Sequence, residues 1–62
     1  MEKIRLSNGK WQSFITAENP SWKFYYTRTF EEAEELKITL SELGNHCEIG
    51  DNSHGWFVRV KK

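Results

Sequence analysis

The residue types of a nucleophilic triad lie close together near the end of the chain, as Asp51, Ser53 and His54. A working triad needs a buried carboxylate to orient the histidine, and an oxyanion hole to receive the developing negative charge. The surrounding run Gly50–Gly55 is rich in Gly, Asn, Asp and Ser, which is typical of an exposed hairpin tip and supplies neither requirement. We therefore expect no catalytic residues, and we interpret the protein as non-enzymatic.

The residue types of a zinc site also occur, at His46, Cys47, Asp51 and His54. Because His46 and Cys47 are adjacent in a predicted strand, their side chains point to opposite faces of the sheet. Two candidates then remain in the loop, fewer than the three or four protein ligands that zinc uses. The chain also has no glycine-rich phosphate loop. We expect no metal site and no cofactor, and we interpret Cys47 as a small core residue.

Basic and acidic side chains are distributed unevenly along the chain. Nine Lys and Arg residues balance nine Asp and Glu residues, so the formal net charge is zero. The segment Phe30–Leu43 nevertheless carries Glu at five positions and only one basic residue, Lys37. We interpret its acids as a solvated helix face, and their early position in the helix is favourable by itself. The remaining basic residues predict a separate cationic surface, which suits a polyanion or an acidic protein patch.

Turn and capping signals divide the chain into strands and one helix. Asn8-Gly9 is typical of a two-residue hairpin turn. Thr29 and Glu32 form a capping box that predicts the start of a helix, and Gly44 predicts its end. We expect strands at Lys3–Ser7, Lys10–Ala17, Trp22–Arg28, His46–Ile49 and Trp56–Lys61, and a helix from Phe30 to about Leu43.

This order, βββαββ, predicts an α+β domain spanning residues 1–62, with a single antiparallel sheet and the helix packed on one face. A two-residue first turn sets Leu6 opposite Trp11, and alternation then separates the two faces. The inner face is expected to carry Ile4, Leu6, Trp11, Ile15, Trp22, Phe24, Tyr26, Cys47, Ile49, Trp56, Val58 and Val60. The outer face is expected to carry Lys3, Arg5, Lys10, Gln12, Phe14, Lys23, Tyr25, Phe57, Arg59 and Lys61.

The expected outer face combines cations with aromatic rings, and we interpret it as a binding surface. Rings can stack on bases while Lys and Arg neutralise phosphates, which makes nucleic acid the leading partner. The alternative is an inhibitor-like protein that binds a host protein with an acidic patch through this face or a sheet edge. A third interpretation is structural, because aromatics favour strands and Lys keeps sheets soluble. The predicted binding residues are Lys3, Arg5, Lys10, Phe14, Lys23, Tyr25, Phe57, Arg59 and Lys61.

The run Asn8-Gly9-Lys10-Trp11, two further strands and then Thr29–Glu34 resemble the AP2-type domain, which also occurs as the amino-terminal domain of tyrosine-family integrases. The resemblance covers about Ile4–Leu43 and implies three strands on one helix, with the outer sheet face laid in the major groove of DNA. It implies DNA contacts by Lys3, Arg5, Lys10, Gln12, Phe14, Lys23 and Tyr25. The dense arginine pattern of those domains is missing here, and the final hairpin is an addition.

A second resemblance concerns the start of the helix and the strands on either side of it. Strand pairs leading into Thr29–Leu36, with a terminal strand after the helix, look similar to small phage proteins that inhibit host RNA polymerase. That resemblance implies a stand-alone inhibitor that binds an enzyme surface through strand edges and charged side chains.

The single Cys47 excludes an intramolecular disulfide and fits a reducing compartment. No signal peptide or apolar membrane span is recognisable in the sequence, so we expect a cytoplasmic protein without membrane contact. A domain of 62 residues buries a limited core, and homodimerisation stays open as a second source of burial.

Overall fold

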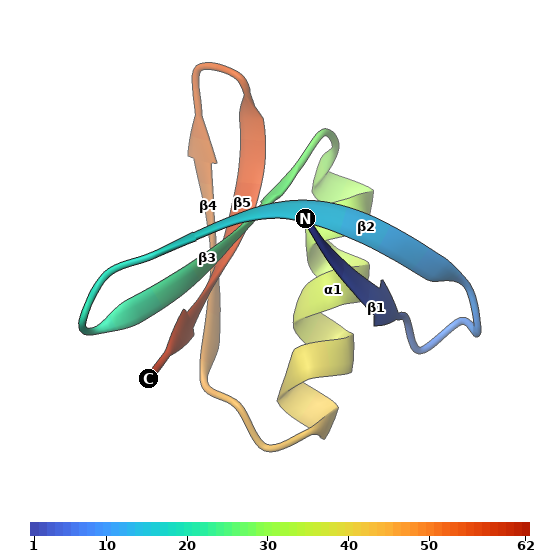
Figure 1. Ribbon diagram of the computed structural model, residues 1–62. Coiled ribbons are helices and arrows are strands. Elements are labelled where there is room, and N and C mark those ends of the chain that lie inside the picture. Colours follow the sequence, from blue (N-terminus) through green and yellow to red (C-terminus); the bar gives the residue numbers. More distant parts are fainter.

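Five strands and one helix follow one another in the expected order in the computed structural model, which describes residues 1–62 (Figure 1). The elements are β1 (Glu2–Arg5), β2 (Trp11–Glu18), β3 (Trp22–Thr27), α1 (Phe30–Glu42), β4 (Cys47–Asn52) and β5 (Gly55–Lys61). All five strands form one antiparallel sheet in the order β1-β2-β3-β5-β4. The predicted α+β class with order βββαββ is confirmed.

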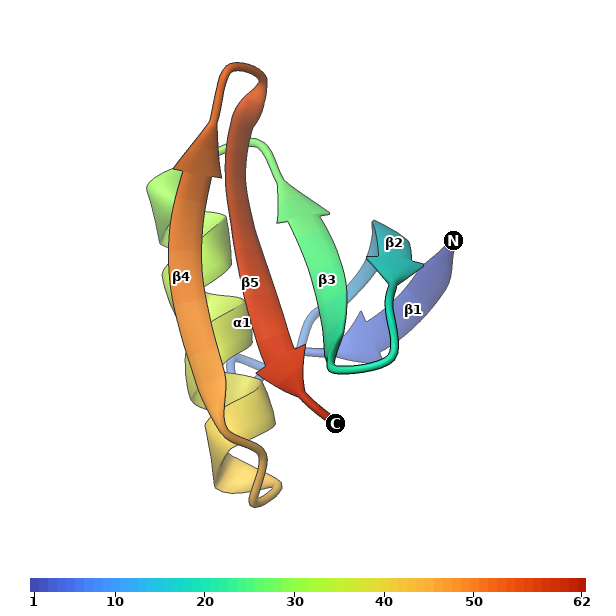
Figure 2. The ribbon, with the colours of Figure 1, turned by 90° about the vertical axis from the view of Figure 1, so that its left-hand side faces the viewer.

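Helix α1 begins at the predicted capping box. The Glu32 amide donates to Thr29 Oγ1 at 3.2 Å, and the Glu32 carboxylate accepts from the Thr29 amide at 3.3 Å. Gly44 follows the helix with φ of 91°, a conformation that glycine adopts without strain. The helix packs on β3, β5 and β4, and Figure 2 shows it behind β4 and β5. With 13 residues, it is neither long nor apolar enough to cross a membrane.

The hydrophobic core lies between α1 and the inner face of the sheet. Its buried members are Leu6, Phe14, Tyr25, Ala33, Leu36, Leu40, Cys47, Val58 and Val60. The predicted inward orientation of Cys47, Val58 and Val60 is confirmed, because all three are buried. Helix α1 contributes Ala33, Leu36 and Leu40 to this core, whereas Phe30 is 42% exposed and Leu43 is 73% exposed.

The first hairpin has a loop one residue longer than predicted. The Leu6 amide donates to the Lys10 carbonyl at 2.8 Å, which leaves three loop residues, and the last of them, Gly9, has φ of 88°. This is typical of a type I turn followed by a glycine bulge. Arg5 therefore lies opposite Trp11, the place predicted for Leu6. Because successive strand residues face opposite sides, the shift of one position inverts β2.

Strand β3 is inverted together with β2, because the two are paired in register. Ile15 lies opposite Tyr26 and Ala17 lies opposite Phe24, so these side chains share the outer face. The expectation that Phe14 and Tyr25 point outward is wrong. Both rings are buried, at 2% and 5% exposure, and meet edge to face with centroids 6.4 Å apart. Gln12 and Lys23 move to the inner side for the same reason. The expected inward placement is wrong for the β2 and β3 members Trp11, Ile15, Trp22, Phe24 and Tyr26.

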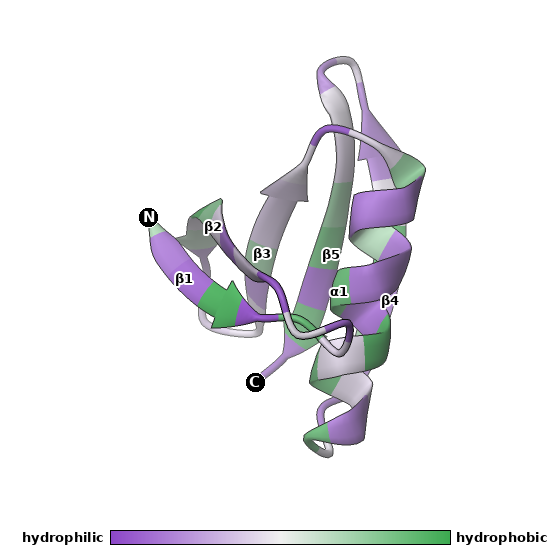
Figure 3. Cartoon of the chain, turned by 90° about the vertical axis from the view of Figure 1, so that its right-hand side faces the viewer, coloured by the Kyte–Doolittle hydropathy of each residue, from purple (hydrophilic) through white to green (hydrophobic).

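Strand β2 is long and pairs with a different strand along each half of its length. Its first half, Trp11–Phe14, pairs with β1, and its second half, Ile15–Glu18, pairs with β3. The strand arcs across the molecule, and its hairpin with β1 lies beside the helix (Figures 1 and 3). The Ser7 amide donates to Thr39 Oγ1 at 2.9 Å, which fixes the hairpin loop against α1. The hairpin thereby supplies Leu6 to the core.

Candidate binding surface on the outer sheet face

The outer face, meaning the side of the sheet opposite α1, arranges its side chains in rows across the strands. Residues directly opposite on neighbouring strands share a face, and their side chains contact one another. The first row is Ile15, Tyr26, Phe57 and Gly50; the second is Ala17, Phe24, Arg59 and Glu48; the third is Trp22, Lys61 and His46. The first row has no charged side chain, whereas the second and third rows combine aromatic rings with charged and polar side chains.

The aromatic cluster consists of Phe24, Tyr26 and Phe57. The rings of Phe24 and Tyr26 are nearly parallel, with an interplanar angle of 14° and centroids 6.5 Å apart. Phe57 meets both of them edge-on, at 5.7 Å from Phe24 and 6.5 Å from Tyr26. Tyr26 is 37% exposed, and the other two rings are half-buried. The cluster is thus held in a fixed geometry and still offers ring surface to a ligand.

Trp22 lies at the other end of the face, with two cations over its ring. The Arg59 guanidinium carbon lies 4.2 Å from the Trp22 ring centroid, and Lys61 Nζ lies 5.0 Å from it. Cations over an indole face are attracted by the ring quadrupole. The indole therefore positions two positive charges beside the aromatic cluster.

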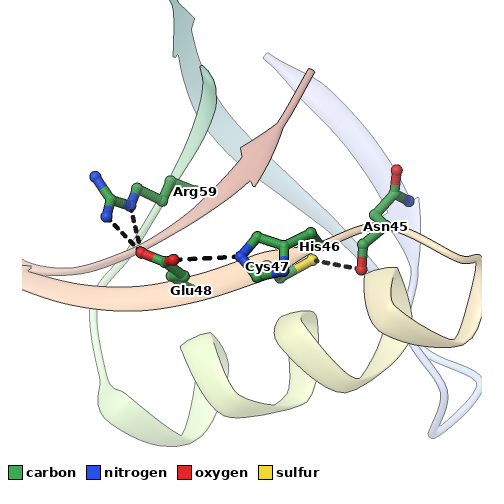
Figure 4. Close-up of polar contacts among 5 residues, drawn as sticks. All are labelled: Asn45, His46, Cys47, Glu48 and Arg59. Atoms are coloured by element: carbon green, nitrogen blue, oxygen red, sulfur yellow. Dashed lines mark hydrogen bonds and ion pairs between the residues drawn. The ribbon is translucent and has the colours of Figure 1, made fainter. Parts of the chain in front are cut away.

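Glu48 neutralises part of this charge, as Figure 4 shows. Arg59 Nε donates to Glu48 Oε1 at 2.9 Å, and Arg59 Nη2 contacts the same oxygen. His46 Nε2 lies 3.2 Å from Glu48 Oε2. The hydrogen bonds from Arg59, and then from His46, hold the pKa of Glu48 below its usual value. Lys61 makes no ion pair, so it is the free cation of the third row.

Six of the predicted binding residues are accessible. Lys3 and Arg5 are exposed on β1, Lys10 is exposed at the end of the hairpin loop, and Lys61 is exposed on β5. Phe57, Arg59 and Lys61 are brought together on the outer face. The basic residues of the β1–β2 hairpin form a second group, beyond strand β2.

The other three predicted residues, Phe14, Lys23 and Tyr25, belong to the inner side. Lys23 Nζ lies 2.5 Å from Glu2 Oε1, and the Tyr25 hydroxyl donates to Glu2 Oε2 at 3.0 Å. The hydrogen bond from Lys23 lowers the pKa of Glu2, and the same bond raises the pKa of Lys23. Burial raises the pKa of Tyr25. These contacts join β1 to β3, and we assign them a structural role.

Trp22, Phe24 and Tyr26 are the outer-face residues of β3 that sequence reasoning missed, and Trp11 and Ile15 are those of β2. Assigning the more apolar side of β3 to the core places them inside, whereas the register of β2 places them outside. The available signal was Asn8-Gly9, which suits a three-residue loop with a bulge as well as a two-residue turn.

The candidate metal ligands do not converge. Cys47 is buried and His46 is exposed, and no group of three His, Cys, Asp or Glu side chains is placed to hold a metal ion. Comparisons of the chain with protein-family models, with curated proteins and with solved structures gave no match.

Proposed function

We propose that the protein is a binding module for single-stranded nucleic acid, and that the strand lies along the outer face. The observation that carries this proposal is the aromatic cluster on β3 and β5, two interior strands of the sheet, with no covering element over it. Proteins that bind single strands often stack bases on aromatic side chains of an open sheet face. Here Trp22, Arg59 and Lys61 add a cationic end to that surface.

The balance of rings and charges favours a single strand over a duplex. Each base that stacks on an aromatic side chain contributes about 1–3 kcal/mol. Duplex binding depends mainly on neutralising phosphates. Beside the aromatic cluster Arg59 is paired with Glu48, which leaves Lys61 as the free cation there, so stacking has to supply much of the affinity at the cluster. A duplex hides the base faces that this surface is suited to bind.

A protein partner is the second candidate, and one observation favours it. Ile15 and Trp11 are each 63% exposed and extend the apolar surface beyond the aromatic cluster. Aromatic residues and Arg are enriched where protein interfaces have their largest energies. The formal net charge of zero is equally compatible with a protein partner and with a polyanion. If this protein is an inhibitor that binds its partner through the outer face, the bound partner makes that face inaccessible to oligonucleotides.

An NMR titration of isotope-labelled protein with a short unstructured DNA strand, its RNA counterpart and a duplex of equal length tests the proposal. We expect shifts at Trp22, Phe24, Tyr26 and Phe57 that are larger for the single strands and weaken with salt. Unchanged spectra at high oligonucleotide concentration would overturn nucleic-acid binding and leave the protein partner.

Two lysine variants provide a matched comparison of charge. Lys61→Glu changes the outer face, whereas Lys37→Glu makes the same change on α1, and neither lysine has an ion pair in the structure. Binding at the outer face requires the first variant to lose affinity much more than the second. Equal losses would show that only overall charge matters and would contradict the assigned surface.

A further inference from the structure

Strands β2 and β3 part beside the aromatic cluster, and a hollow lies where they separate. Their ladder ends at the pair Ile15–Tyr26, because β3 ends at Thr27 and the chain then enters α1. A hollow of about 390 Å³ and a neighbouring one of about 260 Å³ share four lining residues, so they adjoin. The shared residues are Ile15, Tyr26, Thr27 and His54. The larger hollow alone has the volume of a small-ligand site.

One wall of the hollow is apolar and belongs to the outer face. Ile15 and Tyr26 line both parts of the hollow and are also members of the first row. Tyr26 therefore contacts Phe24 and Phe57 on the outer face and also lines the hollow. A strand bound along the cluster would pass directly over the opening.

Strand β2 also offers backbone hydrogen-bonding groups to the hollow. Leu6 and Lys10 form a hydrogen-bonded pair, so by the alternation of an antiparallel ladder the amide and carbonyl of Ser13 point away from β1. They face the side where β3 has departed, because Arg28 is the residue that would continue the ladder. The Arg28 amide instead donates to Glu32 Oε1 at 3.0 Å. Ser13 thus presents a donor and an acceptor side by side at the hollow.

The charged side chains that line the hollow are Arg28 and Glu32. The Glu32 carboxylate accepts from Gln12 Nε2 and from the amides of Arg28 and Thr29, which spreads its negative charge over three donors. Arg28 lines the hollow and is in no salt bridge. A free guanidinium suits a phosphate, whereas the apolar wall and the paired backbone groups suit a planar ring with hydrogen-bonding edges.

We propose that this hollow receives one unstacked base of the bound strand. The base lies against Ile15 and Tyr26, its edge meets the backbone of Ser13, and its phosphate lies near Arg28. Neighbouring bases stack on the aromatic cluster. This inference rests on the proposed function and adds a single position in the strand at which the base is enclosed.

The test is a set of oligonucleotides in which one abasic nucleotide is moved along an otherwise constant short strand. If one base is enclosed, one abasic position lowers affinity by about tenfold or more, whereas the others have smaller effects. Equal effects at every position would overturn the inference while leaving the proposed function intact. Absence of binding by the intact strand would overturn both.

A double-mutant cycle then assigns the sensitive position to the hollow. Ile15→Ser removes the apolar wall at an exposed site, and Ile38→Ser is the matched control on the exposed side of α1. Ile15→Ser should weaken the intact strand several-fold and leave the strand that is abasic at the sensitive position unchanged. Ile38→Ser should change neither. If Ile15→Ser weakened both strands equally, the base would not lie in the hollow.

Discussion

The ring of Phe57 lies so close over Gly50 that a Cβ atom on residue 50 would come within 2.3 Å of Phe57 Cζ. The two residues are directly opposite on β5 and β4. The missing side chain of Gly50 allows Phe57 to cover the edge strand and to remain in contact with Phe24 and Tyr26. The geometry of the aromatic cluster therefore depends on a glycine that contributes no ring of its own.

Gly50→Ala should destabilise the protein by about 1–3 kcal/mol, because the added methyl group overlaps the Phe57 ring. The backbone φ of Gly50 is not positive, so alanine is otherwise acceptable at this position of the strand. Urea unfolding measures the change. In a Phe57→Ala background the same substitution should cost much less, and an equal cost in both backgrounds would contradict the proposed overlap.

Phe14→Ala should remove most of the folded population, since truncation of a buried phenylalanine costs about 3–5 kcal/mol and a domain this small has little stability to lose. Trp11→Ala, at an exposed site three residues earlier, should change stability by about 0.5 kcal/mol or less. Circular dichroism with urea unfolding separates the two. The opposite result would support the hairpin register with Trp11 inside.

Glu2→Gln should make the free energy of unfolding less dependent on pH in the acid range. The pKa of Glu2 is lowered in the folded protein from an ordinary value of 4.5, chiefly by Lys23. Because this pKa is lowered, the Glu2 carboxylate stabilises the folded protein above pH 4.5. That stabilisation is lost as the pH falls through the pKa that Glu2 has in the folded protein. The pair is partly exposed, so solvent screening limits this contribution to about 1 kcal/mol or less.

The measurement is urea unfolding of the wild type and of Glu2→Gln between pH 7 and pH 3. The two curves should converge at the acid end, with Glu48 contributing a residual slope of the same sign because its pKa is also lowered, mainly by Arg59. Parallel curves over the whole range would show that the Glu2–Lys23 contact is not formed.

Glu48→Gln should increase affinity for single strands, because it frees Arg59 from its ion pair. One further phosphate contact should also make the slope of log affinity against log salt steeper by about 0.7. Fluorescence titrations at several salt concentrations measure both effects. Glu34→Gln, the same charge change on the exposed surface of α1, is the control, and a similar gain there would indicate a general charge effect.

The sequence predicted some elements well because their signals were local. Thr29, Glu32 and Gly44 mark the helix ends through hydrogen bonds and a backbone conformation that neighbouring residues set themselves. Strand β5 was oriented correctly because Val58 and Val60 alternate with charged residues. In these segments local chemistry and tertiary structure favour the same arrangement.

Strand β3 lacked such a signal. Its aromatic residues occupy both faces, so alternation alone does not distinguish Tyr25 from Phe24 and Tyr26. Its orientation follows from β2, and the orientation of β2 follows from the length of the loop that ends at Gly9. Asn8-Gly9 fits two loop lengths, and the choice between them depends on which rings fill the core. The loop length is therefore decided by tertiary packing, and the loop length in turn decides which residues form the candidate surface.

The three-residue loop of the first hairpin also has a consequence for how this protein can change over generations. Surface loops usually tolerate the gain or loss of a residue with little effect. Here the loss of one residue from Ser7–Gly9 would turn Trp11 and Ile15 inward and Phe14 outward. A single deletion would thus exchange a core for a surface without replacing any side chain. Loop length at this hairpin should therefore be under stronger selection than the identity of the exposed residues that it orients.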